Sequence, residues 1–401
     1  MVELSYKISV VMKGIGIKVK LLHTSDLHIG KRVNEFSMIE DQKHILNEML
    51  KIVDEHKPEG FIIAGDIYDK GIPGVEAVTL FDWFLTELHN RDIAVFIVSG
   101  NHDSSERIDF AGRIMEENNI HIAGAYNGEL QKVTISDEFG HLNIYLMPFI
   151  KPATIRRFYP DLNIETYQEA VEAIIDNSDI DPSERNLLVA HQFITYAGKE
   201  PERSESEVIS LGGLDNIDGR VFDCFDYVAL GHIHRPQRIG RDTVRYAGSP
   251  LKYSFSESRH SKSVTMVEMG EKGTVQFDML PLIPLRDMRE IKGPIETLID
   301  PTIYREANTL DYIHATITNE EEIYDGIGTL RSVYPNVMRL DFENSRSVFN
   351  ENARMAAVDV EEKSSTELFE EFYESQNNVS MSDVQKSIIV DIFEEMAGER
   401  E

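Results

Sequence analysis

Five short clusters of polar residues carry side chains that can bind metal ions and hydrolyse esters. They supply carboxylate, amide and imidazole groups, a mixture that suits two divalent cations held side by side. Each cluster comes directly after an apolar, strand-like run. The clusters are Asp26-Leu27-His28, Gly65-Asp66, Gly100-Asn101-His102-Asp103, His191 and Gly231-His232-Ile233-His234. This pattern predicts a two-metal phosphoesterase.

The residue types narrow the choice of metal. Asp26 and His28 lie two residues apart, so both side chains can point to one side of an extended loop. A carboxylate such as Asp66 can bridge two cations with its two oxygens, and Asn101 offers a neutral oxygen. Mixed oxygen and imidazole ligation without thiolate suits manganese, iron or zinc, and is unlike a structural zinc site.

Each cluster alone has an ordinary explanation. An Asp-x-His sequence is commonly a surface turn, Gly and Asn are frequent turn residues, and a His-x-His pair can be a hydrogen-bonded polar cluster. Seven candidate ligands that each follow an apolar run share no such explanation. They are Asp26, His28, Asp66, Asn101, His191, His232 and His234. We therefore predict that these seven form one metal centre.

The segments between the clusters predict the elements that position them. Residues 19–26, 61–64 and 94–98 are typical of strands, and residues 40–56 and 75–88 carry helical spacing. Later strand-like runs, at residues 142–147, 187–190, 227–230, 243–247 and 263–268, alternate less regularly with helices. We expect an α/β fold with a two-layered or mixed sheet, whose ligands lie in loops after the carboxyl ends of strands.

The chain divides into five expected segments. They are an N-terminal arm at 1–18, a catalytic domain at 19–283, a small α+β domain at 284–343, a polar linker at 344–364 and a helical pair at 365–401. The small domain shows a strand, helix, strand pattern, and the arm is expected to be disordered. Each final helix carries an apolar stripe.

Composition limits the classes of function. The formal net charge of −30 argues against strong independent DNA binding, but not against nuclease activity, because bound cations reverse the local charge. The single cysteine, Cys224, fits a reducing cytoplasm. No apolar run reaches about 18 residues, so we expect no membrane span, and the first 20 residues lack a signal-peptide pattern.

The order D-x-H, G-D-x-x-D, G-N-H-D, an isolated H and G-H-x-H resembles the calcineurin-like metallophosphoesterase family. The resemblance implies a two-layer β-sandwich flanked by helices. It also implies that one cation takes Asp26, His28, Asp66 and His234, and that the other takes Asp66, Asn101, His191 and His232. Asp66 would then bridge the two.

Longer segments resemble the bacterial SbcD family of nuclease subunits. They are residues 23–31, 64–69, 99–104, 230–237 and 246–251. This resemblance, over residues 19–397, implies a manganese-dependent DNA exonuclease and endonuclease that processes DNA ends and hairpins in double-strand-break repair. It also implies an SbcC-type coiled-coil ATPase as partner and a homodimer within a heterotetramer. The family usually begins near Lys20, so residues 1–18 are either an extra arm or upstream sequence.

By the same resemblance, His102 contacts the phosphate and protonates the departing oxygen instead of binding metal. Asp69 and Asp103 are expected to support the ligands from outside. The basic residues near the ligand loops are candidate DNA contacts: Lys31, Arg32, Arg107, Arg235, Arg238, Arg241, Arg245 and Lys252. Ordinary solvated charge is the alternative for each of them.

The final helices are candidates for docking onto the ATPase, with folding back onto their own domain as the alternative. Their apolar residues are Leu368, Phe369, Phe372, Ile388, Ile392 and Phe393. For dimerisation the helix at 75–88, with Phe81, Trp83 and Phe84, is a candidate face, and plain core packing is equally consistent with its pattern.

Two other functions fit the same core. One is a small-molecule or nucleotide phosphodiesterase, which leaves the extra domain, the helical tail and the basic residues without a role. The other is a non-catalytic scaffold with a degenerate metal site, which the complete set of seven ligands and His102 disfavours.

Overall fold

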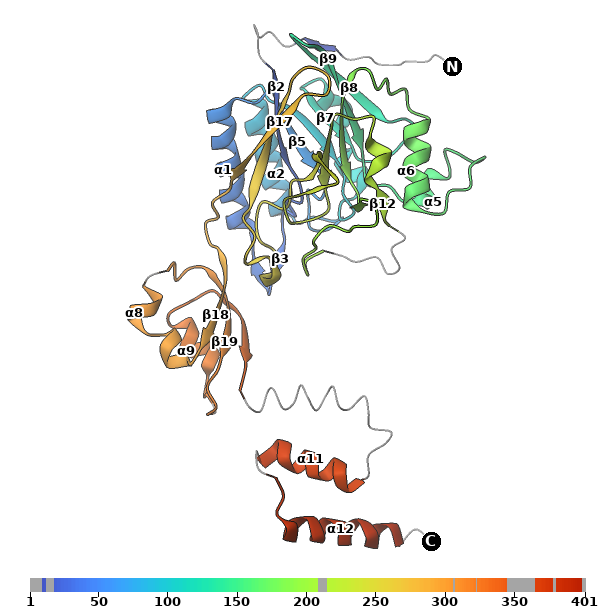
Figure 1. The fold of residues 1–401 in the computed structure, drawn as a ribbon. Coiled ribbons are helices and arrows are strands. Elements are labelled where there is room, and N and C mark those ends of the chain that lie inside the picture. Colours follow the sequence, from blue (N-terminus) through green and yellow to red (C-terminus); the bar gives the residue numbers. More distant parts are fainter. Residues whose placement is uncertain are drawn as a thin grey trace. The chain divides into compact units, whose positions relative to one another are not determined.

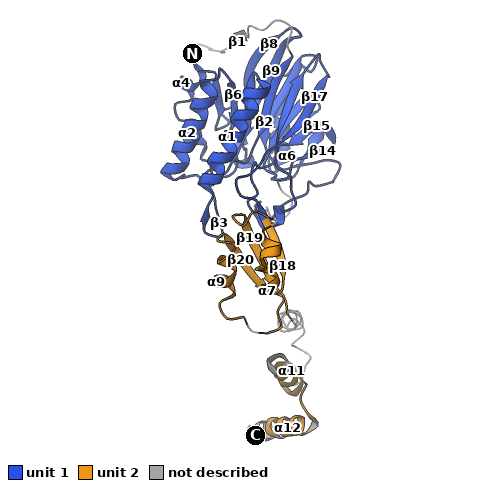
Figure 2. Ribbon diagram, turned by 90° about the vertical axis from the view of Figure 1, so that its left-hand side faces the viewer, with its two compact units in different colours: residues 1–288 blue, residues 289–401 orange. Residues whose placement is uncertain are grey.

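In the computed structural model the described residues are 9–11, 18–207, 215–305, 307–321, 323–344, 365–377 and 380–398. The chain forms two compact units, Met1–Met288 and Arg289–Glu401 (Figures 1 and 2). The expected linker at 344–364 lies outside the described residues except for Asn344.

Two sheets, A and B, form the first unit. Within the described residues, sheet A has the order β1 (Ser9–Val11), β8 (Gln131–Asp137), β9 (Gly140–Met147), β10 (Arg185–His191), β13 (Tyr227–Gly231), β15 (Arg241–Tyr246) and β14 (Gln237–Ile239). Sheet B has the order β17 (Val275–Pro281), β16 (Ser263–Met269), β2 (Val19–Thr24), β5 (Gly60–Ala64), β6 (Ala94–Val98) and β7 (Ile120–Ala123). Both sheets mix parallel and antiparallel neighbours.

The inner faces of the two sheets pack together into one apolar core. Ile62 and Phe96 of sheet B belong to the same buried cluster as Ile144 and Val189 of sheet A. The central strands β5, β6, β10 and β13 are buried along their whole length. This burial on both faces explains why β5, β6 and β13, and residues 187–190 of β10, are apolar without alternation. The expected two-layer sandwich is thereby confirmed.

Helices cover the two outer faces (Figure 1). α1 (Ile39–His56) and α2 (Val75–His89) lie against sheet B, where the Phe61 and Phe84 ring centroids are 5.5 Å apart. α6 (Tyr167–Asp176) covers sheet A and begins at a capping box between Thr166 and Glu169. Phe81 and Phe84 are buried, so these two residues pack in the core and do not form an exposed dimer face.

Shorter elements complete the first unit. They are β3 (Arg32–Val33), β4 (Phe36–Ser37), α3 (Ser105–Ile108), α4 (Gly112–Glu116), α5 (Pro152–Ile155), β11 (Ile194–Thr195), β12 (Ile217–Asp218) and the 3₁₀ turns Gly219–Phe222 and Phe255–Glu257. In the N-terminal arm, where we expected disorder, residues 9–11 pair in parallel with β8 as β1. Residues 1–8 and 12–17 lie outside the described residues, and for them disorder stays a prediction.

The second unit contains a three-stranded sheet, among the residues described there, in the order β18 (Met288–Gly293), β19 (Tyr312–Ile317) and β20 (Val337–Phe342). The helices α7 (Ile295–Leu298), α8 (Pro301–Tyr304) and α9 (Gly326–Arg331) accompany it. Ile313, Leu330 and Val337 form its core. This matches the expected strand, helix, strand pattern, although the compact unit begins at Arg289 and not at residue 284.

The chain ends in the helices α11 (Ser365–Asn377) and α12 (Asp383–Gly398), which pack on each other. The Phe369 and Phe393 ring centroids are 6.1 Å apart, so these two rings join the helices. Phe372, Ile388 and Ile392 are 59%, 52% and 44% exposed. The side chain of Leu368 lies outside the described residues. None of the helices in the described part of the chain is long and apolar enough to span a membrane.

Candidate metal centre

All five polar clusters lie where the inner strands of the two sheets end. β2, β5 and β6 are parallel neighbours in sheet B, and β10 and β13 are parallel neighbours in sheet A. Each cluster begins at or just after the carboxyl end of one of these strands. The two edges meet, because His191 Nδ1 of β10 lies 2.8 Å from the carbonyl oxygen of Ala64 in β5. The predicted candidate ligands therefore come together in one place.

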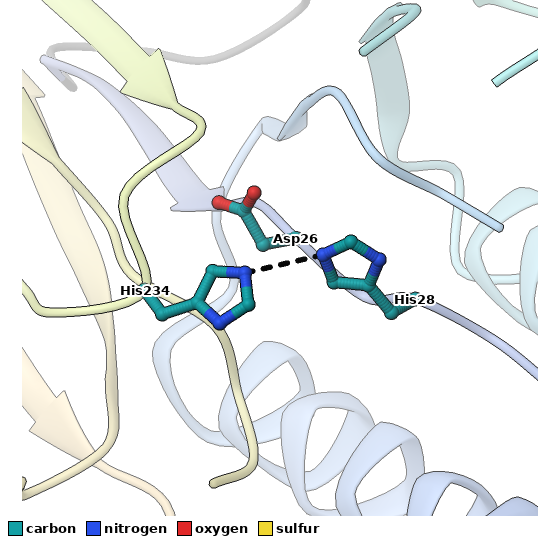
Figure 3. Close-up of side chains that lie close together, drawn as sticks. All are labelled: Asp26, His28 and His234. Atoms are coloured by element: carbon teal, nitrogen blue, oxygen red, sulfur yellow. Dashed lines mark hydrogen bonds between the residues drawn. The ribbon is translucent and has the colours of Figure 1, made fainter. Parts of the chain in front are cut away.

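One group of donor atoms comes from Asp26, His28 and His234, whose candidate ligand atoms lie within 4.8 Å of one another (Figure 3). The Nε2 atoms of the two histidines are 3.2 Å apart. All three residues are almost fully buried. Two imidazole nitrogens and a carboxylate that converge in this way are a typical cation-binding set.

A second group surrounds Asn101. Its side-chain oxygen lies 3.1 Å from His191 Nε2 and 2.9 Å from His232 Nδ1. Asp66 stands between the groups, since its Oδ2 atom is 3.4 Å from His191 Nε2 and 3.6 Å from His28 Nε2. A carboxylate in this position can serve both groups, as expected of a bridging ligand.

The backbone at these residues is unusual. Asp26, His28, Asp66 and His232 all have positive φ angles, of 53°, 44°, 50° and 105°. Residues other than glycine rarely adopt positive φ angles. Such backbone strain is concentrated at functional sites, where it directs side chains that a relaxed strand would point elsewhere. The strained loops therefore position the donor groups.

Two glycines make the close approach possible. A Cβ atom at Gly65, which has a φ of 86°, would lie 2.2 Å from His191 Nδ1. A Cβ atom at Gly231 would lie 1.8 Å from the carbonyl oxygen of Ala64. Any larger residue at either position would push the two sheets apart at the donor groups.

Hydrogen bonds fix which imidazole nitrogen faces the centre. His191 donates from Nδ1 to the carbonyl of Ala64, which leaves Nε2 toward Asn101 and Asp66. The Asp26 carboxylate accepts from the Ser25 hydroxyl at 2.5 Å and from the backbone N–H of His232 at 3.1 Å. Such outer contacts set the tautomer and orientation of metal-binding groups.

Sequence reasoning missed a buried ion pair behind His234. Glu257 lies 3.3 Å from His234 Nδ1 and 2.6 Å from the Lys262 ammonium. Lys262 also donates to the carbonyl of His234, and Ser206 donates to Glu257 while its oxygen lies 2.9 Å from His234 Nδ1. Nothing in the sequence pattern marks Glu257 or Lys262, since their importance comes from burial and not from spacing.

Electrostatics link the buried groups. Burial alone would raise the pKa of Asp66, but the His191 imidazole outweighs burial and holds that pKa well below its usual range. Burial alone would lower the pKa of His191, but the carboxylates of Asp66 and Asp26 outweigh burial and raise this pKa to about 9. Burial, together with His191, lowers the pKa of His232 to about 3. The opposite shifts of Asp66 and His191 have one cause, the attraction between the carboxylate and the imidazole, and a cation bound by both residues would compete with the proton of His191.

His102 lies at the edge of this centre. Its ring is 4.9 Å from the His28 ring, at right angles, and its Nδ1 donates to the carbonyl oxygen of Asp69 at 3.1 Å. The backbone N–H of His102 donates to Asp66 Oδ1 at 2.9 Å. The ring is half-buried and held at Nδ1, and a ligand atom of His102 lies within 4.8 Å of those of His28 and Asp69. Proton transfer by His102, without metal binding, stays a prediction.

The two outer carboxylates act differently. Asp69 pairs with Lys31 at 2.8 Å and lies 3.9 Å from His28 Nδ1, close to the expected position. Asp103 accepts backbone N–H groups of Ile67, Tyr68 and Gly100 at 2.9–3.1 Å. No hydrogen bond among the described residues joins it to His102 or His28, so it braces the ligand loops and does not orient a histidine directly. Burial, with the charge of Asp66, raises the pKa of Asp103 to about 6.

Part of the predicted DNA-contacting set is engaged inside the protein. Arg245 is 7% exposed, and its guanidinium lies 4.2 Å from the Phe277 ring centroid. Arg241 donates to two main-chain carbonyl oxygens, and Lys252 pairs with Asp287 at 2.7 Å. These three cations are engaged in contacts within the fold, and DNA contact by Arg241, Arg245 and Lys252 stays a prediction.

The other predicted cations lie nearer to solvent. Lys31, Arg235 and Arg238 each form an ion pair with an acidic side chain. Arg32 donates to a main-chain carbonyl oxygen. Arg107 is exposed, and the described part of the chain gives it no ion pair. For these five residues, DNA contact stays a prediction.

The donor set fits two divalent cations. Nitrogen and oxygen lone pairs converge from several loops, with one carboxylate between two groups. The ring atom His28 Nδ1 is buried and has no hydrogen-bond partner, so the ring is not fixed by hydrogen bonding at that side. The Nε2 atoms of His28 and His234, 3.2 Å apart, are placed so that both lone pairs could reach one cation.

Comparisons with known proteins agree with this geometry. The family profile described as calcineurin-like phosphoesterase matches residues 19–236. The SbcD C-terminal profile, described as the Type 5 capsule protein repressor C-terminal domain, matches residues 284–377. The chain therefore belongs to the calcineurin-like phosphoesterase family, which implies divalent metal ions as cofactors.

A curated relative narrows the family further. The chain is 31% identical to the SbcD subunit of the SbcCD nuclease from Staphylococcus epidermidis over 374 residues, which are 92% of this chain and 97% of that protein. This relationship places the chain in the SbcD branch and confirms the resemblance drawn from the motifs. A dimetal phosphatase from Danio rerio is 10% identical, with a TM-score of 0.37 over 67% of this chain and all of that one, a likeness too low to argue from.

Proposed function

We propose that this protein is a two-metal DNA nuclease. The observation that carries the proposal is the convergence of seven donor side chains from two sheets, with Asp66 between two groups. The relative named a nuclease subunit supports DNA as the substrate. Asp26, His28, Asp66 and His234 would hold one cation, and Asp66, Asn101, His191 and His232 the other.

Manganese is the proposed metal, because carboxylate, amide and imidazole ligands without thiolate suit it. When bound, the two cations supply Lewis-acid activation of water and of the phosphodiester. The strained loops keep the donor atoms in place before substrate arrives. The buried walls of the centre reduce the screening of these charges.

His102 is the proposed proton donor to the departing sugar oxygen. The Nδ1–H of the ring donates a hydrogen bond to the main-chain carbonyl of Asp69, so the proton that is transferred would be the one on Nε2. A positioned imidazole can donate a proton in one step and recover it from water in the next. Asp66 positions this residue as well, since its Oδ1 atom accepts the His102 backbone N–H.

We further propose that the protein processes DNA ends and hairpins in the cytoplasm together with an SbcC-type ATPase. The name of the relative supports this partner. The exposed Phe372, Ile388 and Ile392 on the terminal helix pair support that pair as the docking element. Such docking would bring the ATPase to a nuclease whose own net charge disfavours DNA.

A homodimer within a heterotetramer is the proposed assembly. The start of α2 carries Val75 and Val78, which are 82% and 45% exposed, and Ile72 precedes it at 76%. Phe110 and Ile114, beyond the third ligand loop, are 77% and 67% exposed. Apolar side chains this exposed favour a protein contact on this side of the unit.

An assay of the purified chain with manganese tests the proposal. Its substrates are linear duplex DNA, a DNA hairpin, single-stranded DNA and bis(p-nitrophenyl) phosphate. Cutting of DNA supports the nuclease. Turnover of the chromogen alone would favour a small-molecule phosphodiesterase, and no turnover of any substrate would favour a non-catalytic scaffold.

A further inference from the structure

We propose that Phe149 and Lys151 form a subsite for the nucleotide next to the cleaved phosphate. The ligand is one nucleotide of a single strand, whose base stacks on the ring and whose phosphate pairs with the ammonium. The inference rests on the proposed nuclease function and deepens it, because it says where the strand runs beyond the metal centre.

Topology places these residues at the edge of the sheet that carries the ligands. β9 runs parallel to β10, with Met147 opposite Ala190, so the chain leaves β9 level with His191. The backbone N–H of Phe149 donates to the carbonyl of Ser99 at 2.9 Å, which ties this segment to the loop that carries Asn101. The segment after β9 is thus part of the rim of the centre, although it contains no ligand.

Phe149 lies directly beside a candidate ligand. Its ring centroid is 6.3 Å from that of His191, at an angle of 78°, and its side chain is half-buried. The Lys151 ammonium lies 6.0 Å from the Phe149 ring centroid. The ammonium is therefore at most about 12 Å from the His191 ring, close enough to meet the strand near the metal centre.

Charge distinguishes Lys151 from two other cations near the centre. Lys31 pairs with Asp69, and Arg203, beside His232 through Phe193, pairs with Glu200 at 3.0 Å. Lys151 is exposed, and no ion pair is found for it within the described residues. Because the chain has a net charge of −30, a phosphate is attracted most strongly to a cation at the rim that no carboxylate neutralises.

The pairing of an aromatic ring with a cation matches how proteins hold single strands. Bases of any sequence stack on aromatic side chains, and a cation beside the ring follows the backbone. Phosphate contacts of this kind position the strand without reading its sequence. A small chromogenic diester has no neighbouring nucleotide, so it cannot use the subsite.

The test compares Lys151→Gln and Phe149→Leu with the unchanged protein in manganese. We measure kcat/KM for a single-stranded oligonucleotide and for bis(p-nitrophenyl) phosphate, and take their ratio. Each substitution should lower the ratio roughly tenfold, the expected cost of one lost stacking or phosphate contact. Lys132→Gln is the matched control, because Lys132 also lies over a ring, 5.4 Å from the centroid of Tyr145, but within strands β8 and β9.

A binding measurement separates charge from fold. In a His102→Ala background, to prevent cleavage, Lys151→Gln should reduce the slope of log Kd against log salt by about 0.7, and Phe149→Leu should not. An unchanged ratio of kcat/KM values, or an unchanged salt slope for Lys151→Gln, would overturn the subsite while DNA cutting by the unchanged protein still upheld the nuclease. If the unchanged protein cuts only the chromogen, the proposed function itself fails.

Discussion

At the scale of single residues, Asp66 joins the parts of the site. One of its oxygens faces His28 and His191, and the other accepts the backbone N–H of His102. The convergence of the seven candidate ligands could be predicted from the sequence, because each follows a buried strand at a recognisable spacing. Glu257 could not, because its role comes from burial against His234 and Lys262.

We predict that His102→Ala keeps the metals and loses most turnover. The imidazole lies at the edge of the donor groups and its loss removes a proton donor, so kcat on DNA should fall about 100- to 10,000-fold. Metal content is counted on the same preparation. Loss of bound manganese, or turnover equal to that of the unchanged protein, would refute this role.

Glu257→Gln should weaken one metal site selectively. Without the carboxylate, the His234 imidazole loses the partner that favours its Nδ1–H form, and manganese affinity at that site should fall about 10- to 100-fold. Electron paramagnetic resonance measures the change, because the signal of two spin-coupled manganese ions is replaced by the signal of a single bound manganese ion.

Two variants control for the loss of a buried charge. Asp137→Asn breaks the buried Arg185 ion pair away from the ligands and should leave both metals bound. Glu257→Gln with Lys262→Met removes both charges of the pair and should still show the weakened site. A coupled signal in the Glu257 variants at the same manganese concentration as the unchanged protein would contradict the prediction.

At the scale of elements, the site depends on how closely two sheets approach. The strands could be predicted from apolar runs, but their pairing could not, since His191 and Ala64 meet across 127 residues. The same limit applies to the basic residues that follow β13. A basic run after β13 does not reveal that Arg245 packs on Phe277 of the other sheet, because sequence spacing says nothing about the partner sheet.

Gly231→Ala should therefore disrupt both the fold and the metal centre. Its Cβ would overlap the carbonyl oxygen of Ala64, so we expect the free energy of unfolding to fall by about 3 kcal/mol. Urea unfolding is followed by the fluorescence of Trp83, the single tryptophan. Gly74→Ala, where a Cβ meets nothing within 4 Å, should change stability by less than about 1 kcal/mol. Equal stability of the two variants would argue against close sheet packing as the cause.

At the scale of the whole molecule, the chain combines an acidic enzyme with a terminal helix pair. The net charge of −30 opposes DNA, and bound cations together with a partner would offset it. The two terminal helices could be predicted from their apolar stripes, whereas the linker lies outside the described residues and stays a prediction. The predicted boundary at residue 284 precedes the observed division at Arg289, because Arg286 and Asp287 form ion pairs with Asp41 and Lys252 of the first unit.

Removing residues 365–401 should separate partner binding from catalysis. The shortened chain should no longer co-purify with the SbcC-type ATPase, because Phe372, Ile388 and Ile392 are lost. Manganese-dependent cutting of single strands should persist, since the proposed ligands all precede residue 235. Retained co-purification would show that another surface docks the partner.

The number of metal ions per active chain tests the central claim most directly. Metal-free protein is titrated with manganese, and bound metal and single-strand cutting are measured on the same samples. We predict two ions per chain, cutting that follows the second ion, and loss of both behaviours in Asp66→Asn. Saturation at one ion with full cutting, or an unchanged titration in Asp66→Asn, would contradict a two-metal nuclease.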